Sequence, residues 1–446
     1  MVSNRIRLSR RSWLAGVMAA GLAASRTGTA AIRNRPRVAA VVTEFTFRSH
    51  AHVILENFLE PYYFNGRLTD PGVELVSLYV DQFPPGDMSR QAAREYGFRI
   101  YDTIEGALCC GGERLAVDGV LSIGEHGQYP RNEREQIMYP RKEFFDRIVG
   151  VFRRSGRVVP LFNDKHFSYR FDWAAEMMAT VRRMNIPFMA GSSVPLAERR
   201  PPLELAPGSR IVEAVSIHSG GLESYDFHAL EVLQSMVELR AGGESGVRSV
   251  QLLEGDEAWK AAREGRWDLK LAEAAMSAGE SRPIDNLEQF VEPATGRVHP
   301  AHVILIEYQD GLKATVLRIG ASSTRWKFAC RLEDGRVAAT SFYVGPWQNR
   351  NLFKALSHAI QWHIRHGEAP YPVERTFLTT GVVIAAVESR FQGRRRLETP
   401  HLAIAYQPRD FRAFREMGAS WQIITESTPE PKGINPGGPR PPGYRQ

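Results

Sequence analysis

Alternating strands and helices over residues 38–190 constrain this chain more than any other feature. The continuous apolar run at 38–42 predicts a strand buried on both faces, and further strands are predicted at 73–80, 119–123, 158–162 and 188–190. Helical patterns separate these runs, and a short strand is predicted at 98–101. Strands that alternate with helices form parallel sheets, because each crossover helix covers a face of the sheet. The sequence therefore predicts an α/β fold with a doubly wound parallel sheet over 36–195.

The pattern changes after residue 196. Strand patterns flank residues 309–311 and 333–335, and both of these short segments contain Asp-Gly. Asp-Gly between two strands predicts a hairpin turn. We therefore expect a second, α+β domain over 196–405 with a largely antiparallel open sheet, whose final helices pack back on the first domain. The proline- and glycine-rich residues 429–446 predict a disordered tail.

The first 30 residues predict an export signal. Arg10 and Arg11 precede an apolar run at 14–24, and small residues at 28–30 suit a cleavage site. Paired arginines in this position indicate the bacterial Tat route, so we expect a periplasmic or secreted protein. The apolar run is shorter than the roughly 20 residues that cross a bilayer. No later run is longer, so no integral membrane segment is expected after cleavage.

The formal net charge of +7 does not indicate a nucleic-acid partner. Five arginines and no acidic residue fall within residues 1–30, so most of this charge belongs to the export signal. Nucleic-acid sites combine blocks of lysine and arginine with aromatic side chains, and no such block occurs in the remaining sequence. We therefore expect a small-molecule ligand rather than a nucleic acid.

Acids, imidazoles and a lysine directly follow the predicted strands of the first sheet. They are Thr43 and Glu44 after the first strand, Asp81 after the second, Glu125 and His126 after 119–123, and Asp164, Lys165 and His166 after 158–162. Ligands of open parallel sheets bind outside the carboxyl ends of the strands. The sequence therefore predicts one polar crevice at this edge.

The sequence resembles the Gfo/Idh/MocA oxidoreductases, which include glucose-fructose oxidoreductase and inositol dehydrogenase. The resemblance covers roughly residues 36–405, and its first strand and helix meet at Ser49-His50-Ala51. Asn163-Asp164-Lys165-His166 stands where the family has Glu-Lys-Pro. Ser224-x-Asp226-x-His228-x-x-Glu231 stands where the family has Asp-x-Gly-x-His-x-x-Asp.

The resemblance implies an oxidoreductase that acts on a sugar or polyol hydroxyl with tightly bound NAD or NADP. It implies that Lys165 orients the reacting oxygen and that His228 is a general acid/base, with Asp164 as the third catalytic candidate. The candidate cofactor-binding residues are Thr43, Glu44, Asp81, Glu125 and His126. Members of this family often associate through the second sheet, so a homo-oligomer is also expected.

The dinucleotide-binding loop departs from the family pattern. The three glycines of Gly-x-Gly-x-x-Gly fall on Val42, Glu44 and Phe47 in this chain. A phenylalanine obstructs the approach of a pyrophosphate to the backbone, and a glutamate repels it. Asp81 suits a ribose hydroxyl, but it lies 38 residues after Thr43, nearly twice the usual ~20.

Two further functions fit the same scaffold. One is a metal-dependent hydrolase or lyase acting on carbohydrate, with ligands drawn from Glu44, His50, His52, Glu125, His126, Asp164 and His166. The other is a non-catalytic carbohydrate-binding protein, which the altered glycine loop favours. Bound metal in protein purified without added ions would indicate the hydrolase or lyase. Affinity for a sugar without turnover would indicate the binding protein.

Overall fold

The computed structural model describes residues 35–439. The predicted export signal at 1–30 therefore lies outside the described residues, as do residues 440–446. From Pro36 onward the chain forms one compact unit. It contains a six-stranded sheet that ends at β8 (Phe188–Gly191) and an eight-stranded sheet that begins at β9 (Glu198–Arg200). No helix within 35–439 combines the length and the apolar character needed to cross a membrane.

The first sheet is parallel throughout, with strand order β5-β4-β1-β6-β7-β8. The bounds of its other strands are β1 Arg37–Val42, β4 Glu74–Val80, β5 Arg99–Tyr101, β6 Gly119–Ile123 and β7 Leu161–Asp164. With the central strand first in the chain, this is the order of a Rossmann-like doubly wound sheet. The predicted fold class is confirmed for this part of the chain.

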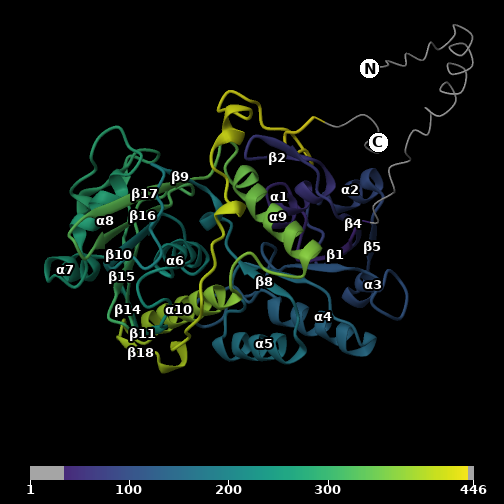
Figure 1. Ribbon diagram of the computed structural model, residues 1–446, viewed down its shortest axis with the longest axis horizontal. Coiled ribbons are helices and arrows are strands. Elements are labelled where there is room, and N and C mark those ends of the chain that lie inside the picture. Colours follow the sequence, from purple (N-terminus) through teal and green to yellow (C-terminus); the bar gives the residue numbers. More distant parts are fainter. Residues whose placement is uncertain (1–34, 440–446) are drawn as a thin grey trace, which may run out of the picture. The chain divides into compact units, whose positions relative to one another are not determined.

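The central strand β1 is apolar because both of its faces are covered. Val38, Ala40 and Val42 pack in one core, with α1 (His50–Leu59) and α9 (Asn349–His366). Ala39 and Val41 pack in another core, with α4 (Arg141–Ser155) and α5 (Phe171–Met184). Figure 1 shows these two pairs of helices on opposite sides of the sheet. Side chains alternate between the faces of a strand, so a continuous apolar run supplies both cores.

The second sheet is largely antiparallel, with order β18-β11-β14-β15-β10-β16-β17-β9. Only β10 and β15 pair in parallel. Its strands are β10 Ile211–His218, β11 Val247–Glu254, β14 His302–Tyr308, β15 Lys313–Arg318, β16 Lys327–Leu332, β17 Val337–Tyr343 and β18 Leu397–Glu398. The two Asp-Gly turns join β14 to β15 and β16 to β17, where the sequence predicts hairpins. The antiparallel character of this sheet is therefore confirmed.

Helices cover both faces of the second sheet. On one face α6 (Ser224–Val237) packs against β10, and on the other lie α7 (Asp256–Arg263) and α8 (Leu269–Ser277). The remaining elements are α2 Ser89–Tyr96, α3 Ile104–Leu108, the ribbon of β2 Tyr62–Phe64 with β3 Arg67–Thr69, and the ribbon of β12 Val291–Glu292 with β13 Arg297–Val298. α6 matters most for function, because its first turn faces the carboxyl edge of the first sheet.

Two helices from late in the chain tie the sheets together. α9 packs against α1, and α10 (Val373–Phe391) contacts α5 and β8 on one side and α6 and β11 on the other. Figure 1 shows α10 between the two sheets and α9 beside α1. These contacts set the position of α6 relative to the edge of the parallel sheet.

The C-terminal segment differs from the predicted disordered tail at 429–446, because its described part, 429–439, is packed. The Arg350 guanidinium donates to the carbonyl oxygens of Pro431, Gly433 (3.1 Å) and Asn435 (2.8 Å). Gly437 also forms a bridge with Tyr62 of β2. The composition predicted disorder because proline and glycine supply few apolar contacts. In the structure, three carbonyl oxygens of this segment instead accept hydrogen bonds from one buried arginine.

Arg350 also forms a buried ion pair with Glu56 of α1. Both side chains are fully buried, and Nε of Arg350 lies 3.3 Å from Oε1 of Glu56. Burial alone would raise the pKa of Glu56. Hydrogen bonds from His52 and Arg350 outweigh this effect and hold the pKa below 4.5. The pair therefore joins α1, α9 and the C-terminal segment through one ionised carboxylate.

Replacement Arg350→Ala should lower the free energy of unfolding by about 3–5 kcal/mol, because it leaves Glu56 buried without its cation. Urea denaturation followed by tryptophan fluorescence measures the change. Arg409→Ala is the matched control. Arg409 pairs with Glu368 on the surface, where such pairs contribute about 0–1 kcal/mol. Similar losses in both variants would contradict the assigned role of Arg350.

Candidate functional site

A cavity of about 220 Å³ opens at the carboxyl edge of the first sheet. We call it the edge cavity. Its walls come from the loops after β6 and β7, from the first turn of α6, from the loop before β16, and from the starts of α1 and α9. Small-molecule sites in proteins are typically ~300–1,000 Å³ and combine apolar walls with a few polar groups. The edge cavity is therefore suited to a compact ligand of about one sugar ring.

A buried carboxylate organises the floor of the edge cavity. Oε1 of Glu125 accepts a hydrogen bond from Nζ of Lys165 at 2.7 Å, and Oε2 accepts one from Arg141. The same Nζ donates to Oγ of Ser224 at 2.8 Å, which joins the first sheet to α6. Burial alone would raise the pKa of Glu125, but the charges of Lys165 and Arg141 hold it well below 4.5. Glu125 is therefore ionised and fixes the Lys165 ammonium.

Backbone strain gathers around this cavity. Four non-glycine residues of its wall have left-handed φ values: Arg48 (64°), His126 (71°), Lys165 (57°) and Gln348 (55°). This conformation costs of order 1–3 kcal/mol for a side chain other than glycine, and such residues cluster at functional sites. The side chains held in this way, an imidazole and a lysine among them, carry the polar chemistry of the cavity.

His228 projects from α6 into the edge cavity as a neutral imidazole. Its Nδ1 lies 2.6 Å from Oγ of Ser192, and that oxygen also accepts the N–H of Val194 at 3.1 Å. Where the Ser192 hydroxyl donates to Nδ1, Nε2 carries the imidazole hydrogen. Burial and the charge of Lys165 hold the pKa of His228 well below 6.5. A neutral imidazole can accept a proton, so the general acid/base role expected from the sequence stays a prediction.

Asp164 does not line the edge cavity but contacts His50, which does. Its Oδ2 lies 2.6 Å from Nδ1 of His50, the first residue of α1. The His50 ring packs edge-on against Phe353 of α9, with 4.6 Å between the ring centres. Asp164 is 1% exposed and does not line the cavity. It therefore orients His50, whereas its neighbour Lys165 reaches the cavity itself.

A buried triad fixes the first turn of α6. Oδ1 of Asp226 accepts from Nε2 of His218 at 2.8 Å and from Nε2 of His302 at 2.7 Å. Its Oδ2 accepts the backbone N–H of Glu223 at 2.8 Å, which completes a capping box. The triad thereby holds the turn from which Ser224 and His228 project.

The same triad has the ligand types of a zinc site. Among residues 35–439, His218, Asp226 and His302 are the one group of three whose ligand atoms lie within 4.8 Å of one another. However, Nδ1 of His218 accepts the N–H of Gly220 at 3.3 Å, so Nε2 carries hydrogen and donates to Asp226. Nε2 would have to lose that hydrogen to bind a metal. Hydrogen bonding accounts for the triad as it stands.

Three of the metal ligands proposed from the sequence, His52, Glu44 and His166, have other partners. Nε2 of His52 lies 3.4 Å from Glu56 and faces the C-terminal segment. Glu44 accepts from Thr46 in its own turn. Nε2 of His166 lies 3.3 Å from Arg141, a cation. Within the described part of the chain these side chains form no three-ligand group of the kind seen at Asp226.

The turn between β1 and α1 is packed where a dinucleotide phosphate loop would be open. Phe45 is fully buried in the core. Its carbonyl oxygen accepts the N–H of Met88 at 2.7 Å. The Thr43 hydroxyl donates to the carbonyl oxygen of Glu125 at 2.6 Å. The turn is thus bonded to the loops on both sides, in place of the glycine backbone that approaches a pyrophosphate.

A second set of bonds crosses directly over the end of β1. Gln82, after β4, and Gln128, after β6, exchange two hydrogen bonds of 3.0 and 2.9 Å. Since β1 lies between β4 and β6, this pair spans the place where a pyrophosphate would lie. Both carboxylate oxygens of Asp81 accept tyrosine hydroxyls, from Tyr79 and Tyr129, at 2.7 Å each. In this arrangement the residues present do not fit a dinucleotide laid along the edge.

The structure brings together some of the residues proposed from the sequence and separates others. Lys165, His228, Glu125 and His126 line the edge cavity. The others lie elsewhere: Asp164 behind its wall, Thr43 beneath the loop after β6, Glu44 in its own turn, and Asp81 in a separate surface hollow with Tyr129.

Sequence reasoning missed Arg141, Tyr225 and Trp326. The rings of Tyr225 and Trp326 stack at 5.4 Å in the cavity wall. Tyr225 adjoins the Ser224 motif and could have been found from it, whereas no local pattern marks Arg141 or Trp326.

Stability should fall as the pH drops from 6.5 towards 4. Burial, together with the charge of His50 near His126 and of Arg141 near His166, lowers the pKa of each of these histidines to about 4. Between those pH values the unfolded chain binds protons that the folded chain does not. The free energy of unfolding should therefore decrease by up to about 1.4 kcal/mol per pH unit for each histidine.

Urea midpoints measured over this pH range test the expectation. His166→Gln should reduce the slope of stability against pH, and exposed His366→Gln should leave it unchanged. A stability that rises on acidification would contradict the expectation.

Comparisons with known proteins agree with this fold. No family model and no curated protein matches the chain. The crystal structure of GenD2 from gentamicin A biosynthesis in complex with NAD matches with a TM-score of 0.53 and 14% identity, over 82% of this chain and 96% of GenD2. Apo scyllo-inositol dehydrogenase from Lactobacillus casei matches with a TM-score of 0.50 and 10% identity, over 81% and 98%. The chain therefore has the fold of these two solved structures.

Proposed function

We propose that this protein acts on a hydroxyl group of a sugar or polyol bound in the edge cavity. The observation that carries the proposal is that Lys165, from the first sheet, and His228, from α6, line one small cavity. Stacked Tyr225 and Trp326 add an apolar wall beside these polar groups. A compact site with a few placed donors and aromatic walls matches the chemistry of a small polyhydroxylated ligand.

The two donors suit an oxygen that gains negative charge. The Lys165 ammonium is held by Glu125 and Ser224, and His228 is held by Ser192. Fixed donors aimed at a developing oxyanion stabilise it without reorganisation, which is the main catalytic contribution of many sites. In this proposal Lys165 and His228 bind the oxygen of the ligand hydroxyl. Ser192 and Glu125 orient them.

The redox partner suggested by the fold is NAD or NADP. GenD2 was solved with NAD, and a nicotinamide accepts hydride from the carbon that bears the hydroxyl. The packed turn after β1 and the Gln82–Gln128 bonds do not provide a phosphate cradle in this chain. The proposed binding of a ligand hydroxyl by Lys165 and His228 does not depend on the nucleotide.

Non-catalytic carbohydrate binding is the second candidate. The specific observation that favours it is the set of hydrogen bonds that closes the β1 edge while leaving the edge cavity open. A sugar bound with measurable affinity, but never converted with or without added NAD(P), would support this candidate over the oxidoreductase.

Replacements Lys165→Ala and His228→Ala should each weaken the binding of sugars or polyols and abolish any turnover, because each removes one donor to the same oxygen. Loss of a hydrogen bond involving a charged group should weaken binding about tenfold or more. Calorimetry with a panel of polyols measures affinity. Exposed Lys260→Ala is the control, and circular dichroism checks the fold. Unchanged affinity in both site variants would refute the site.

Mass spectrometry of small molecules released from the denatured protein, with metal analysis of the same sample, tests the reaction class. Released NAD(P) would support the oxidoreductase directly. Bound metal without nucleotide would instead favour the hydrolase or lyase. Polyol binding to protein without either would leave the binding function as the supported one.

We also propose that the protein works in the cell envelope or outside the cell after export by the Tat route, as the signal at 1–30 suggests. Replacing Arg10 and Arg11 together by lysine should abolish export, because that route depends on the arginine pair. Fractionation of cells carrying the full chain, followed by immunoblotting, measures the outcome. A single Arg7→Lys change is the matched control. Normal export of the paired variant would contradict the proposed route.

A further inference from the structure

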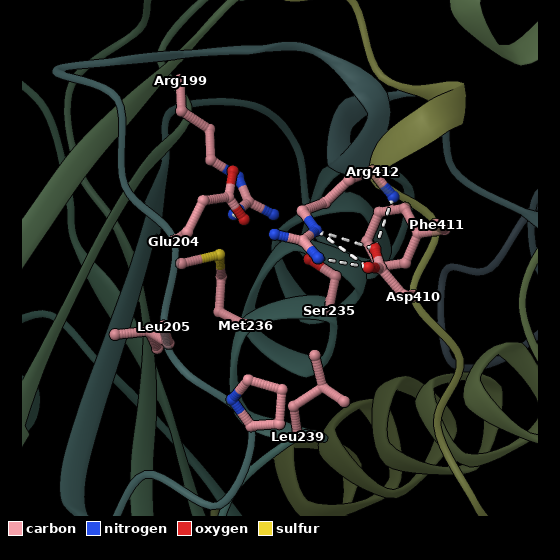
Figure 2. A pocket seen from close by; sticks show the side chains of 10 residues that line it. Arg199, Glu204, Leu205, Ser235, Met236, Leu239, Asp410, Phe411 and Arg412 are labelled. Atoms are coloured by element: carbon pink, nitrogen blue, oxygen red, sulfur yellow. Dashed lines mark hydrogen bonds and ion pairs between the residues drawn. The ribbon is translucent and has the colours of Figure 1, made fainter.

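A second, smaller cavity lies at the far end of α6 from His228. It has a volume of about 80 Å³ and is bounded by β9, the loop after it, the last turns of α6 and the segment around residue 411. Figure 2 shows the guanidinium groups of Arg199 and Arg412 turned toward one another beside the carboxylate of Glu204. We call this the arginine cavity. It shares no lining residue with the edge cavity.

Two buried arginines beside the arginine cavity share a single carboxylate partner. Arg199, Arg375 and Arg415 are all at least nine-tenths buried. Glu204 is the shared partner of Arg199 and Arg415, and Glu238 is the partner of Arg375. Arg199 and Arg415 therefore have only one carboxylate between them, whereas Arg375 has Glu238 as its own partner and Glu231 nearby. Arg412 does not change the balance, because it is paired with Asp410.

Several buried N–H donors of these arginines lack an acceptor. Nε of Arg199, both Nε and Nη1 of Arg415, and Nη1 of Arg375 have no hydrogen-bond partner. The hydroxyl of Tyr371, whose ring lies against Arg375, has none either. A buried polar group without a partner costs free energy, and a charged one costs more, so each exception in a folded protein calls for a missing partner.

The pKa of Arg199 also indicates a shortage of negative charge beside its guanidinium. Burial, reinforced by the charges of Arg415 and Arg375, lowers the pKa of Arg199 to about 9, and Glu204 offsets this only in part. Glu204 itself is largely exposed, with a side chain 42% accessible, and its charge is therefore screened by water. An additional anion beside Arg199 would oppose this lowering of the pKa.

We propose that the arginine cavity is a binding site for a small oxyanion, such as phosphate, sulfate or a carboxylate. Arginine is the residue best suited to such ligands, because its planar fork offers several N–H donors to the oxygens. The available volume exceeds that of a single water and suits an anion of a few heavy atoms. Leu205, Met236 and Leu239 add apolar surface to the lining of the cavity.

The site also has a physical connection to the edge cavity. The helix that carries His228 near its start carries Ser235, Met236 and Leu239 at or just beyond its end. Arg375, which holds Glu238 directly after that helix, belongs to α10. An oxyanion bound here would therefore stabilise the packing of α6 against β9 and α10, without touching the polyol site.

Thermal denaturation of the mature chain, titrated with sodium phosphate at constant ionic strength, tests the proposal. A ligand that binds only the folded state raises the melting temperature in a saturable manner. We expect such a rise with phosphate, and the same titration with sulfate and with acetate identifies whether tetrahedral anions or carboxylates bind. Arg199→Gln and Arg412→Gln should weaken the response about tenfold or more. Exposed Arg409→Gln should retain it.

The variants separate this proposal from the function of the edge cavity. Lys165→Ala should keep the response to phosphate, and Arg412→Gln should keep the affinity for polyols. If Arg199→Gln does not fold, Arg412→Gln still tests anion binding, because Arg412 is exposed and its replacement should leave the fold intact. The proposal is overturned if sodium chloride alone produces the same rise, if no anion produces one, or if Arg412→Gln responds as strongly as the unaltered chain.

Discussion

The buried carboxylate of Glu125 is the interaction on which the functional edge of this protein depends. A carboxylate that is 5% exposed is stable only with cations beside it. Lys165 and Arg141 meet that need, and Lys165 in turn reaches Ser224 across the gap between the sheets. The ammonium of Lys165 is therefore pointed into the edge cavity by a partner beneath it. The backbone of Lys165 adopts a left-handed conformation, which is strained for a residue with a side chain.

The carboxyl edge of the first sheet is open in one part and closed by hydrogen bonds in another. Near β6 and β7 the edge is hollow and polar, whereas over β1 it is bonded shut by Thr43, Gln82 and Gln128. Fold alone does not decide which of these two outcomes occurs, because function lies in the side chains that a fold presents. The fold thus accounts for the place of the cavity, and the local packing accounts for what that cavity is able to hold.

Distant segments complete both cavities. The edge cavity uses residues from α1, α6 and α9, and the arginine cavity joins β9 to the segment after α10. Buried ion pairs hold these segments in place: Arg350 with Glu56 on one side of the molecule, and Arg375 with Glu238 on the other. In each pair a late helix supplies the arginine and an earlier helix, or the residue just after it, supplies the carboxylate. The pairs fix how the late helices close over the two sheets.

The sequence alone determined the parallel sheet, the antiparallel sheet with its two Asp-Gly hairpins, the loop that carries Lys165 and the helix that carries His228. These follow from local rules, because strand burial, helix periodicity and turn chemistry are written in neighbouring residues. Only the tertiary structure decided that Asp164 contacts His50, that Ser192 contacts His228, and that the segment at 429–439 is packed. Each of these depends on partners tens to hundreds of residues apart. The direction of a side chain, and hence its hydrogen bonding and its pKa, is set by whichever groups the complete fold places beside it.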